Sequence, residues 1–244
     1  MSEQMSPAHE GWARGPGRPA SNCRDCRLAD LTVPCKRDDV RRLVRYEERD
    51  GGLYVVPYDT DPAPVKPYRE HVVVGYGPVP CPIMLIGEAP GFHEDREGLP
   101  FRPSAPAGRV LHRVAADVGL FLKLDDDQWT LPSAHNPFAY VTNALKCRPL
   151  DNKIDRFPDA LEVCRSTYLF EEIEVVQPKV VVCLGKVAAQ PWFGTTSALA
   201  FRQIGERLYV HAPHPSYIAR GNHDAEAKLR EALTVAKEVG YAHE

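Results

Sequence analysis

One stretch decides the fold of this 244-residue chain: IMLIGEAPG, residues 83–91. Four apolar residues followed by Gly87 predict a short buried strand that stops abruptly. We therefore expect Glu88 at the carboxyl end of a strand, which is where open α/β sheets bind their ligands. A carboxylate at that position indicates a functional residue. The alternative is a solvent-exposed glutamate that caps the following helix.

Three further segments repeat this pattern of an apolar strand followed by a polar turn: YVTN at 140–143, VVVCL at 180–184 and LYV at 208–210. Helix signals occur between and after them, and they predict helices over 108–119, over 158–177, from 186 onward and over 224–239. Strands that alternate with helices predict a doubly wound, mostly parallel sheet. The polar ends of four such strands can meet at one cleft.

The composition indicates one globular domain with appendages. A chain of 244 residues can bury one substantial core, so we expect a single domain over 21–244 after a disordered tail over 1–20. An amino-terminal extension at about 36–80 begins with a charged, helix-like run over 38–50. The longest apolar runs are about five residues, too short to span a membrane. The lack of a charged-then-apolar leader predicts a cytoplasmic protein.

The cysteines suggest a metal site. Of the seven, Cys23 and Cys26 form a C-x2-C pair, and Cys147 and Cys164 follow near the middle of the chain. Four thiolates suit either a structural zinc ion or an iron-sulfur cluster, and spacing does not separate the two. Cys183 lies in an apolar run and is expected in the core. An odd count without a secretory leader argues against a disulfide framework.

Several short motifs, taken in order, carry a resemblance to a known family. They are GEAPG at 87–91 with Glu94 and Asp95, GLPF at 98–101, PAGR at 106–109, VTN at 141–143, KCRP at 146–149, LG at 184–185 and HPSY at 214–217. Together they resemble the uracil-DNA glycosylase superfamily, and within it the iron-sulfur branch called family 4. The resemblance implies a three-layer α/β/α fold with a central four-stranded, mostly parallel sheet. It also implies a [4Fe-4S] cluster bound by Cys23, Cys26, Cys147 and Cys164, with structural zinc as the alternative.

The resemblance implies cleavage of the bond between uracil and deoxyribose, which places negative charge on the base and positive charge on the sugar. By resemblance His214 donates a hydrogen bond to uracil O2, where the negative charge develops. Glu88 positions the attacking water, and Glu94 supports or replaces it. Better-known branches carry an aspartate where this chain has Ala89, so the catalytic carboxylate has moved. The alternatives are a histidine that only fixes its turn and a glutamate that only stabilises a helix start.

Recognition of the base requires a flipped-out nucleotide, a stacking surface and a group that reads the base edge. By resemblance Phe101 stacks on uracil, and the Asn143 amide reads O4 and N3, which excludes cytosine because its exocyclic amine reverses donor and acceptor. Backbone amides near Ala89 add a further contact. A core phenylalanine and a turn asparagine are the corresponding structural alternatives.

A net charge of −3 gives no global indication of nucleic acid, so DNA binding depends on local basic residues. Candidates for a basic surface, each with an ordinary solvated side chain as its alternative, are Arg102, Arg109, Arg113, Lys146, Arg148 and Arg220. The resemblance assigns DNA contacts to Arg109, Lys186, Ser216 and Arg220, with residues 217–220 inserted where the base leaves the duplex.

Three features depart from the family pattern. About two extra residues lie between Phe101 and Pro106, residues 150–153 lack the histidine-bearing loop that one branch uses for covalent capture, and the 36–80 segment is similar to that of family 5. We expect a monomeric enzyme acting on single- or double-stranded uracil-containing DNA. The alternatives are a glycosylase for another modified or deaminated base, a catalytically silent DNA-binding module, and a zinc-binding fold with no role on DNA.

Overall fold

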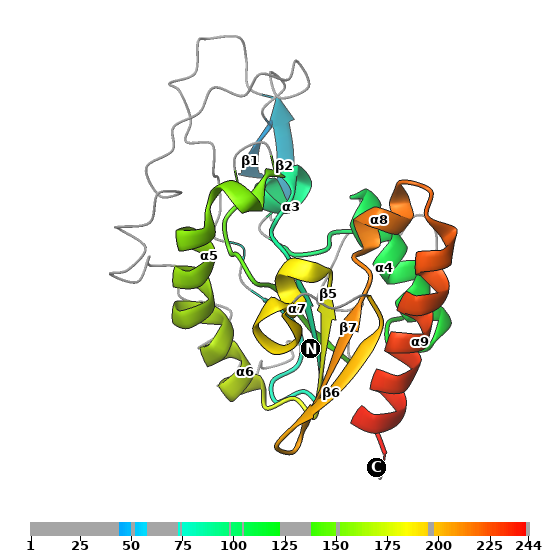
Figure 1. The fold of residues 1–244 in the computed structure, drawn as a ribbon. Helices are drawn as coiled ribbons and strands as arrows, with labels where there is room; N and C mark the ends of the chain where they lie inside the picture. The colour runs from blue at the N-terminus through cyan, green and yellow to red at the C-terminus, as the bar shows by residue number, and fades with distance from the viewer. Residues whose placement is uncertain are drawn as a thin grey trace.

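The computed structural model describes residues 44–49, 52–57, 73, 75–97, 99–103, 105–122, 138–149, 152–194 and 198–242. Its centre is a five-stranded sheet in the order β4-β3-β5-β7-β6 (Figure 1). The strands are β3 (Ile83–Gly87), β4 (Tyr140–Asn143), β5 (Val180–Leu184), β6 (Ala200–Ile204) and β7 (Arg207–Ala212). Strands β4, β3, β5 and β7 run parallel, and β6 pairs antiparallel with β7.

The four parallel strands confirm the segments predicted from the sequence. Every residue of β3, β4 and β5 is buried, which explains why these strands are continuous apolar or small runs rather than alternating ones. The predicted number of four strands is short by one, because β6 was not expected. Four of its five residues are exposed, and Arg202 and Gln203 interrupt the apolar pattern that marks the other strands.

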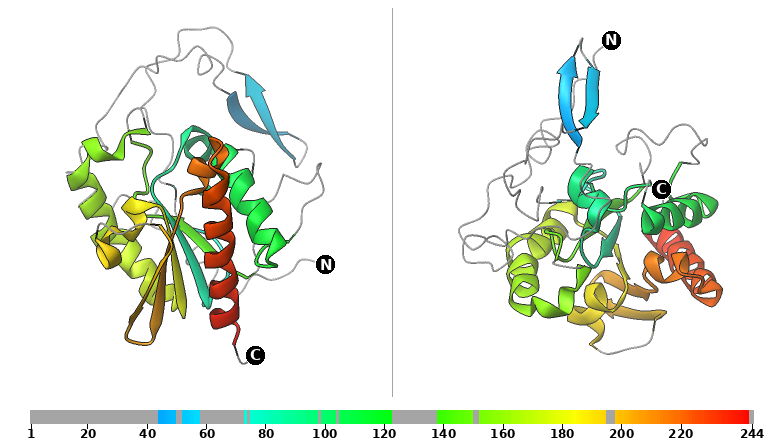
Figure 2. Two further views of the ribbon diagram at one scale, coloured as in Figure 1. Left: turned by 45° about the vertical axis from the view of Figure 1, so that its right-hand side comes forward. Right: turned by 90° about the horizontal axis from the view of Figure 1, so that it is seen from above.

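Helices cover both faces of the sheet, which confirms the three-layer α/β/α class (Figures 1 and 2). One layer contains α5 (Pro158–Cys164), the π-helical turn η5 (Arg165–Leu169), α6 (Phe170–Val176) and α7 (Lys186–Phe193). The other contains α4 (Pro106–Asp117), α8 (Pro215–Ala219) and α9 (His223–Gly240). The sheet side chains alternate between two apolar clusters, with Met84 and Ile86 on the first face and Ile83 and Leu85 on the second.

The remaining elements are short. Helix α3 (Phe92–Glu97) follows the turn after β3, and a 3₁₀ turn, η4 (Ile154–Arg156), precedes α5. In the part of the chain that the structure describes, no helix has the length and apolar character needed to cross a membrane.

The prediction of a helix-like run over 38–50 is wrong for residues 44–49. These residues form β1 (Val44–Arg49), which pairs antiparallel with β2 (Gly52–Pro57), Arg49 opposite Gly52. The missed signal is the Asp50-Gly51 pair between two segments with β-branched and aromatic residues, which is typical of a two-residue hairpin. The tail over 1–20 and most of the 36–80 extension lie outside the described residues.

Candidate active site at the strand ends

The carboxyl ends of the four parallel strands bring the predicted residues to one edge of the sheet. Glu88 directly follows β3, Asn143 ends β4, Gly185 follows β5, and His214 lies two residues beyond β7. Gly87 is paired with Asn143 in the register of the sheet. The strand ends therefore lie at one edge of the sheet, where Glu88, Gly185 and His214 line one cavity and Asn143 lies outside its lining.

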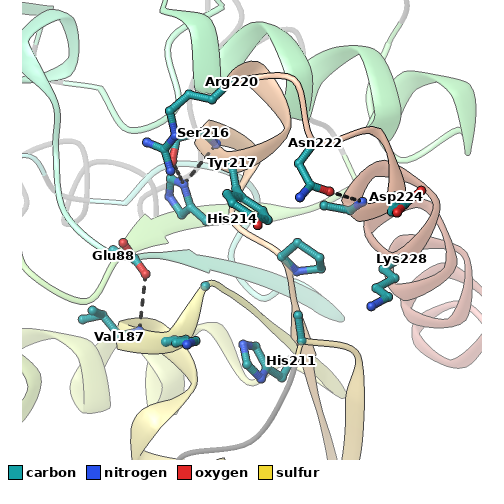
Figure 3. A pocket seen from close by; sticks show the side chains of 15 residues that line it. Glu88, Val187, His211, His214, Ser216, Tyr217, Arg220, Asn222, Asp224 and Lys228 are labelled. Atoms are coloured by element: carbon teal, nitrogen blue, oxygen red, sulfur yellow. Dashed lines mark hydrogen bonds between the residues drawn. The ribbon is translucent and has the colours of Figure 1, made fainter.

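A cavity of about 740 Å³ opens beside these strand ends (Figure 3). Figure 3 shows Glu88, His214 and Arg220 on one side of the cavity, with Asn222, Asp224 and Lys228 of the α9 start on the other. Lys186, His211, Ser216 and Tyr217 complete the polar lining. We call Glu88, His214 and Arg220 the groove side of the site.

Glu88 has a lightly held carboxylate. Its Oε1 accepts one hydrogen bond, from the Val187 main-chain N–H in the first turn of α7, at 3.4 Å. Burial raises the pKa of this carboxyl, and the Val187 hydrogen bond and the charge of Arg220 oppose the rise. Most of the acceptor capacity of Glu88 is therefore left for another group.

His214 is held through one ring nitrogen. It is the N-cap of α8, and its Nδ1 accepts the Ser216 main-chain N–H at 3.2 Å and lies 2.8 Å from Ser216 Oγ. Burial, reinforced by the nearby positive charge of Arg220, lowers the pKa of His214 to about 4. The imidazole is therefore neutral at pH 7, and because Nδ1 accepts, its proton is on Nε2.

Gly185 makes room for the side chains of Glu88 and His214. Its backbone has φ +92° and ψ 169°, a region that is essentially restricted to glycine. A Cβ atom at this position would lie 2.4 Å from Glu88 Oε1 and 3.0 Å from His214 Cβ. The residue that directly follows β5 therefore has no side chain, and this makes room for Glu88 and His214.

Phe101 and Glu94 form a second group with Asn143, which we call the base side. The two carboxylate oxygens of Glu94 accept main-chain N–H groups, Oε2 from Gly91 at 2.7 Å and Oε1 from Phe101 at 2.5 Å. Burial raises the pKa of Glu94, and these two hydrogen bonds oppose the rise. Glu94 therefore acts on the conformation of the loop between β3 and α4.

The conformation of Phe101 explains why two polar residues hold it. Its φ is +50°, a left-handed backbone that is uncommon for a bulky residue. Glu94 binds its N–H, and His112 Nε2 of α4 lies 3.2 Å from its carbonyl oxygen. The ring is 2% exposed, and its centroid lies 5.7 Å from that of His214. Phe101 thus connects the base side to the groove side.

Asn143 has a buried amide with no hydrogen-bond partner among the described residues, at either Oδ1 or Nδ2. It lies close enough to Glu94 to help lower the pKa of that carboxyl, although no hydrogen bond of ordinary geometry forms. A Cβ atom on Gly87 would lie 2.2 Å from Asn143 Oδ1 and 2.5 Å from the Phe101 ring. Gly87 therefore lets the amide and the ring come together against the main chain.

Three of the four residues predicted to contact DNA line the cavity. Lys186, at the start of α7, and Arg220, at the end of α8, are exposed and line the cavity with Ser216. Arg109 is exposed on α4 and is not part of the cavity lining. Ala89, the predicted backbone contact, lies half-buried next to Glu88. The roles of these residues stay predictions.

Two of the candidates for a basic surface, Lys146 and Arg113, pair with carboxylates of the protein itself. The prediction for Lys146 is wrong, because its side chain is 0% exposed and its Nζ lies 2.5 Å from Glu172 Oε2. Arg113 donates two hydrogen bonds of 2.7 Å to Glu226. Its charge is therefore already paired within the protein.

The predicted cluster ligands are divided between two parts of the chain. Cys147 and Cys164 are 5% and 4% exposed and belong to the same apolar cluster between the sheet and helices α5 and α6. Cys23 and Cys26 lie outside the described residues. Within the described ranges, no three His, Cys, Asp or Glu side chains are grouped to hold a metal ion. Two buried cysteines in one layer fit the thiolate donors that an iron-sulfur cluster or zinc requires. Cys183 is buried in the core, as expected.

Sequence reasoning missed two residues that shape the site, His112 and Glu172, and it quoted Gly185 as part of a motif without giving it a role. Glu172 could have been found, because Leu169, three positions before it, and Val176, four positions after it, share its helix face and predict burial of its carboxylate. Gly185, between an apolar strand and a helix start, carried a turn signal. His112 carried no signal, since its partner is a main-chain carbonyl that only the fold brings near.

The fold and site define an α/β protein with a polar cavity at the carboxyl ends of a mostly parallel sheet. Comparison with protein families gives a match to the uracil DNA glycosylase superfamily over residues 74–237, more than half of the chain. The chain belongs to this superfamily.

Curated relatives include type-4 uracil-DNA glycosylases. That of Archaeoglobus fulgidus is 38% identical over 122 residues, 50% of this chain and 52% of the relative. That of Sulfurisphaera tokodaii is 36% identical over 119 residues, 49% and 46% of the two chains. A type-5 uracil-DNA glycosylase of Pyrobaculum aerophilum is 27% identical over 198 residues, 72% and 84% of the two chains. The chain thus spans about half the length of the two type-4 relatives, and the expected likeness to family 4 is confirmed.

Proposed function

We propose that this chain is a monofunctional DNA glycosylase that hydrolyses the N-glycosidic bond of uracil in DNA and leaves an abasic site. The observation that carries the proposal is the amide of Asn143. Its Oδ1 and Nδ2 are buried without partners among the described residues, next to the ring of Phe101. Unpaired buried polar atoms are costly, so a donor and an acceptor held in this way indicate a missing ligand.

Uracil supplies the matching edge. Its N3–H donates to Asn143 Oδ1 and its O4 accepts from Nδ2, while the ring of Phe101 provides a stacking surface. Cytosine presents an acceptor at N3 and an amine donor at C4. Its N3 would therefore face the acceptor Oδ1 of Asn143, and its amine would face the donor Nδ2. Discrimination by buried hydrogen-bonding groups is strong, because the wrong base leaves them unpaired.

The groove side supplies the chemistry. As the glycosidic bond breaks, the base departs with negative charge on O2, and the neutral His214 donates its Nε2 proton in a hydrogen bond to that oxygen. Because Nδ1 is already held by Ser216, the imidazole is oriented before substrate binds. Glu88 orients a water molecule toward the sugar C1′ and stabilises the positive charge that develops there. Glu94 supports the site by holding Phe101.

The partner is uracil-containing DNA, single- or double-stranded, bound by a monomer. Lys186, Ser216 and Arg220 line the cavity beside the reacting groups, which supports the proposal that they contact the phosphates flanking the flipped nucleotide. Arg109 extends this contact on α4, and a main-chain amide near Ala89 adds a contact to the base.

A [4Fe-4S] cluster bound by Cys23, Cys26, Cys147 and Cys164 is part of the proposal, with zinc as the alternative. When bound, either group crosslinks the amino-terminal segment to the core through thiolate bonds. The test is optical, because a thiolate-bound cluster colours the protein brown and zinc leaves it colourless.

The activity is tested with a fluorescent oligonucleotide that contains one uracil, incubated with the purified chain and then treated with alkali to cleave abasic sites. We expect cleavage at uracil and none when cytosine or thymine takes its place. His214→Ala should slow excision about 10²–10³-fold, since it removes one hydrogen-bond donor from the developing anion. No cleavage by the folded wild-type protein would overturn the proposal, and oligonucleotides with other deaminated bases then test the alternative substrate.

A further inference from the structure

A buried ion pair lies directly behind the predicted base-reading residue. Lys146 is fully buried, and its three ammonium donors are all used. Nζ lies 2.5 Å from Glu172 Oε2, 2.6 Å from Thr142 Oγ1 and 2.7 Å from the carbonyl oxygen of Asn143. Lys146 thus joins the main chain of Asn143 to helix α6.

The carboxylate of Glu172 has hydrogen-bond partners in several segments of the chain. Its Oε1 accepts the Gly75 main-chain N–H at 3.2 Å and lies 3.4 Å from the Tyr140 hydroxyl, and Thr142 Oγ1 lies 3.0 Å from Oε2. Its side chain is 4% exposed. The pair is therefore the centre of a hydrogen-bonded network that fixes the end of β4.

The position of β4 explains why such a network matters. β4 is an edge strand of the five-stranded sheet, and Asn143 is its last residue. β3 holds one side of this strand end, because the Ala144 N–H donates to the Gly87 carbonyl. The carbonyl of Asn143 is held by Lys146 instead. On the outer edge of β4, Tyr76 exchanges two main-chain hydrogen bonds with Val141, two residues before Asn143. The ion pair therefore fixes the main chain just beyond that bridge, at the end of the strand.

Stability does not account for a buried ion pair. Removing two charges from water is expensive, and replacing such a pair with uncharged residues of similar size is often neutral or stabilising. A constraint on geometry is a better explanation, because displacing a positioned group by about 1 Å can slow a reaction about 10²-fold. The group positioned here is the amide that has no partner of its own among the described residues.

We propose that Lys146 and Glu172 are positioning residues for base recognition, acting on uracil through the main chain of Asn143. This inference rests on the proposed function and deepens it. The pair holds the Asn143 amide at the angle and depth at which it meets the edge of the flipped base. It does not contact the substrate.

The test replaces the pair without leaving a buried charge, in the double variant Lys146→Met/Glu172→Gln. The amide introduced by Glu172→Gln can still accept the Gly75 N–H, whereas the thioether introduced by Lys146→Met cannot donate to the Asn143 carbonyl. We expect single-turnover excision of uracil to slow about 10–100-fold while the Kd for the same DNA, from fluorescence anisotropy, stays within about twofold. Folding is checked by thermal unfolding, and Lys146→Leu/Glu172→Gln, which is predicted to show the same loss, replaces the first variant if that does not fold.

A double-mutant cycle separates positioning from a general structural effect. In an Asn143→Ala background the pair has no amide to position, so replacing it should change the excision rate by less than about threefold. The matched control is Arg165→Met. Arg165 is also a buried cation next to a predicted cluster cysteine, but it donates to the Val187 carbonyl and to Gln190. Its effect should be the same with and without Asn143→Ala.

Three outcomes decide the inference. Wild-type excision rates in the pair variants overturn it, and so does an equal rate loss in the presence and absence of Asn143. Suppression of the loss by Asn143→Ala supports it. Failure of the wild-type protein to excise uracil is a different result, because it overturns the proposed function before any variant is compared.

Discussion

On the base side, Glu94 accepts two main-chain N–H groups within 2.7 Å, whereas on the groove side Glu88 accepts one at 3.4 Å. Phe101 on the base side is held at both its N–H and its carbonyl, and Lys146 holds the carbonyl of Asn143. On the groove side, the only side-chain hydrogen bonds of His214 among the described residues are at Nδ1. The two sides thus differ in how firmly they are held, and on the base side the amide of Asn143 is the exception, since it has no partner among the described residues.

This difference matches two different tasks. Reading a base requires a rigid surface, because selectivity depends on small displacements of donors and acceptors. The reaction requires groups with unused atoms, since a water molecule and a departing oxygen must bind to them. Burial changes the pKa values of Glu88 and His214 in opposite directions, upward for the acid and downward for the base. Perturbed pKa values of this kind are typical of functional sites.

The largest expected effect compares Glu88, which is half-buried, with Glu94, which is buried. Glu88→Gln should slow uracil excision about 10²–10⁴-fold with little change in stability, because it removes the group that orients water. Glu94→Gln should lower the free energy of unfolding by about 1–3 kcal/mol. The NH₂ group of the introduced amide would replace one carboxylate oxygen, so one of the two main-chain N–H groups would lose its acceptor. The measurements are single-turnover excision and urea unfolding.

The control for both substitutions is Glu206→Gln, in the exposed turn between β6 and β7. It should change neither excision nor stability. The distinction between the two sides would be lost if Glu94→Gln abolished excision in a fully stable protein while Glu88→Gln stayed active.

The second expected effect uses glycines that allow close contacts. Gly87→Ala would press on the Phe101 ring and the Asn143 amide, and Gly185→Ala on Glu88 and His214. We expect excision to fall about 10²-fold in each case, because the displacements needed approach 1 Å. Gly87→Ala should also reduce the preference for uracil over other bases, and Gly185→Ala should leave that preference unchanged.

Gly194→Ala is the control for backbone strain. Gly194 also has a positive φ, +64°, but a Cβ atom there would meet nothing within 4 Å. It should lower stability and leave excision as in the wild type. A loss of excision as large as that of Gly185→Ala would mean that strain, rather than contact with the groove side, explains both variants.

The sequence was sufficient to predict the parallel strands, both helical layers and the position of Glu88, Asn143 and His214 at strand ends. Each of those predictions depended on local patterns of a few residues. The sequence was not sufficient to predict β6, whose side chains are mostly exposed. It was also not sufficient to predict the burial of Lys146, whose partner Glu172 lies 26 positions away. Contacts between distant segments, such as His112 with the Phe101 carbonyl, leave no pattern in one chain.

The third expected effect is the pH dependence of excision. Burial raises the pKa of Glu88 above its ordinary 4.5, whereas His214 has a pKa of about 4 and stays neutral until lower pH. As pH falls, Glu88 is therefore the first of the two to lose its active form. Below its pKa the rate should fall about tenfold per pH unit. His214→Gln should keep the same acid limb at a lower rate, and Glu88→Gln should remove it.

The smallest expected effect is on stability. The folded state binds fewer protons at His214 than the unfolded state between pH 6.5 and about 4, so stability falls as pH falls through that range. Glu88 acts oppositely, because its raised pKa makes the folded state bind more protons as pH falls toward 4.5. His214→Gln should therefore lose less Tm than the wild type between pH 7 and 5, by about 2–4 °C, and Glu88→Gln should lose more than the wild type. Gly194→Ala changes no titratable group, and a Cβ atom there meets nothing within 4 Å, so the shape of its Tm curve with pH should match the wild type. A changed shape in Gly194→Ala would mean that backbone strain, rather than His214 and Glu88, produces the pH dependence.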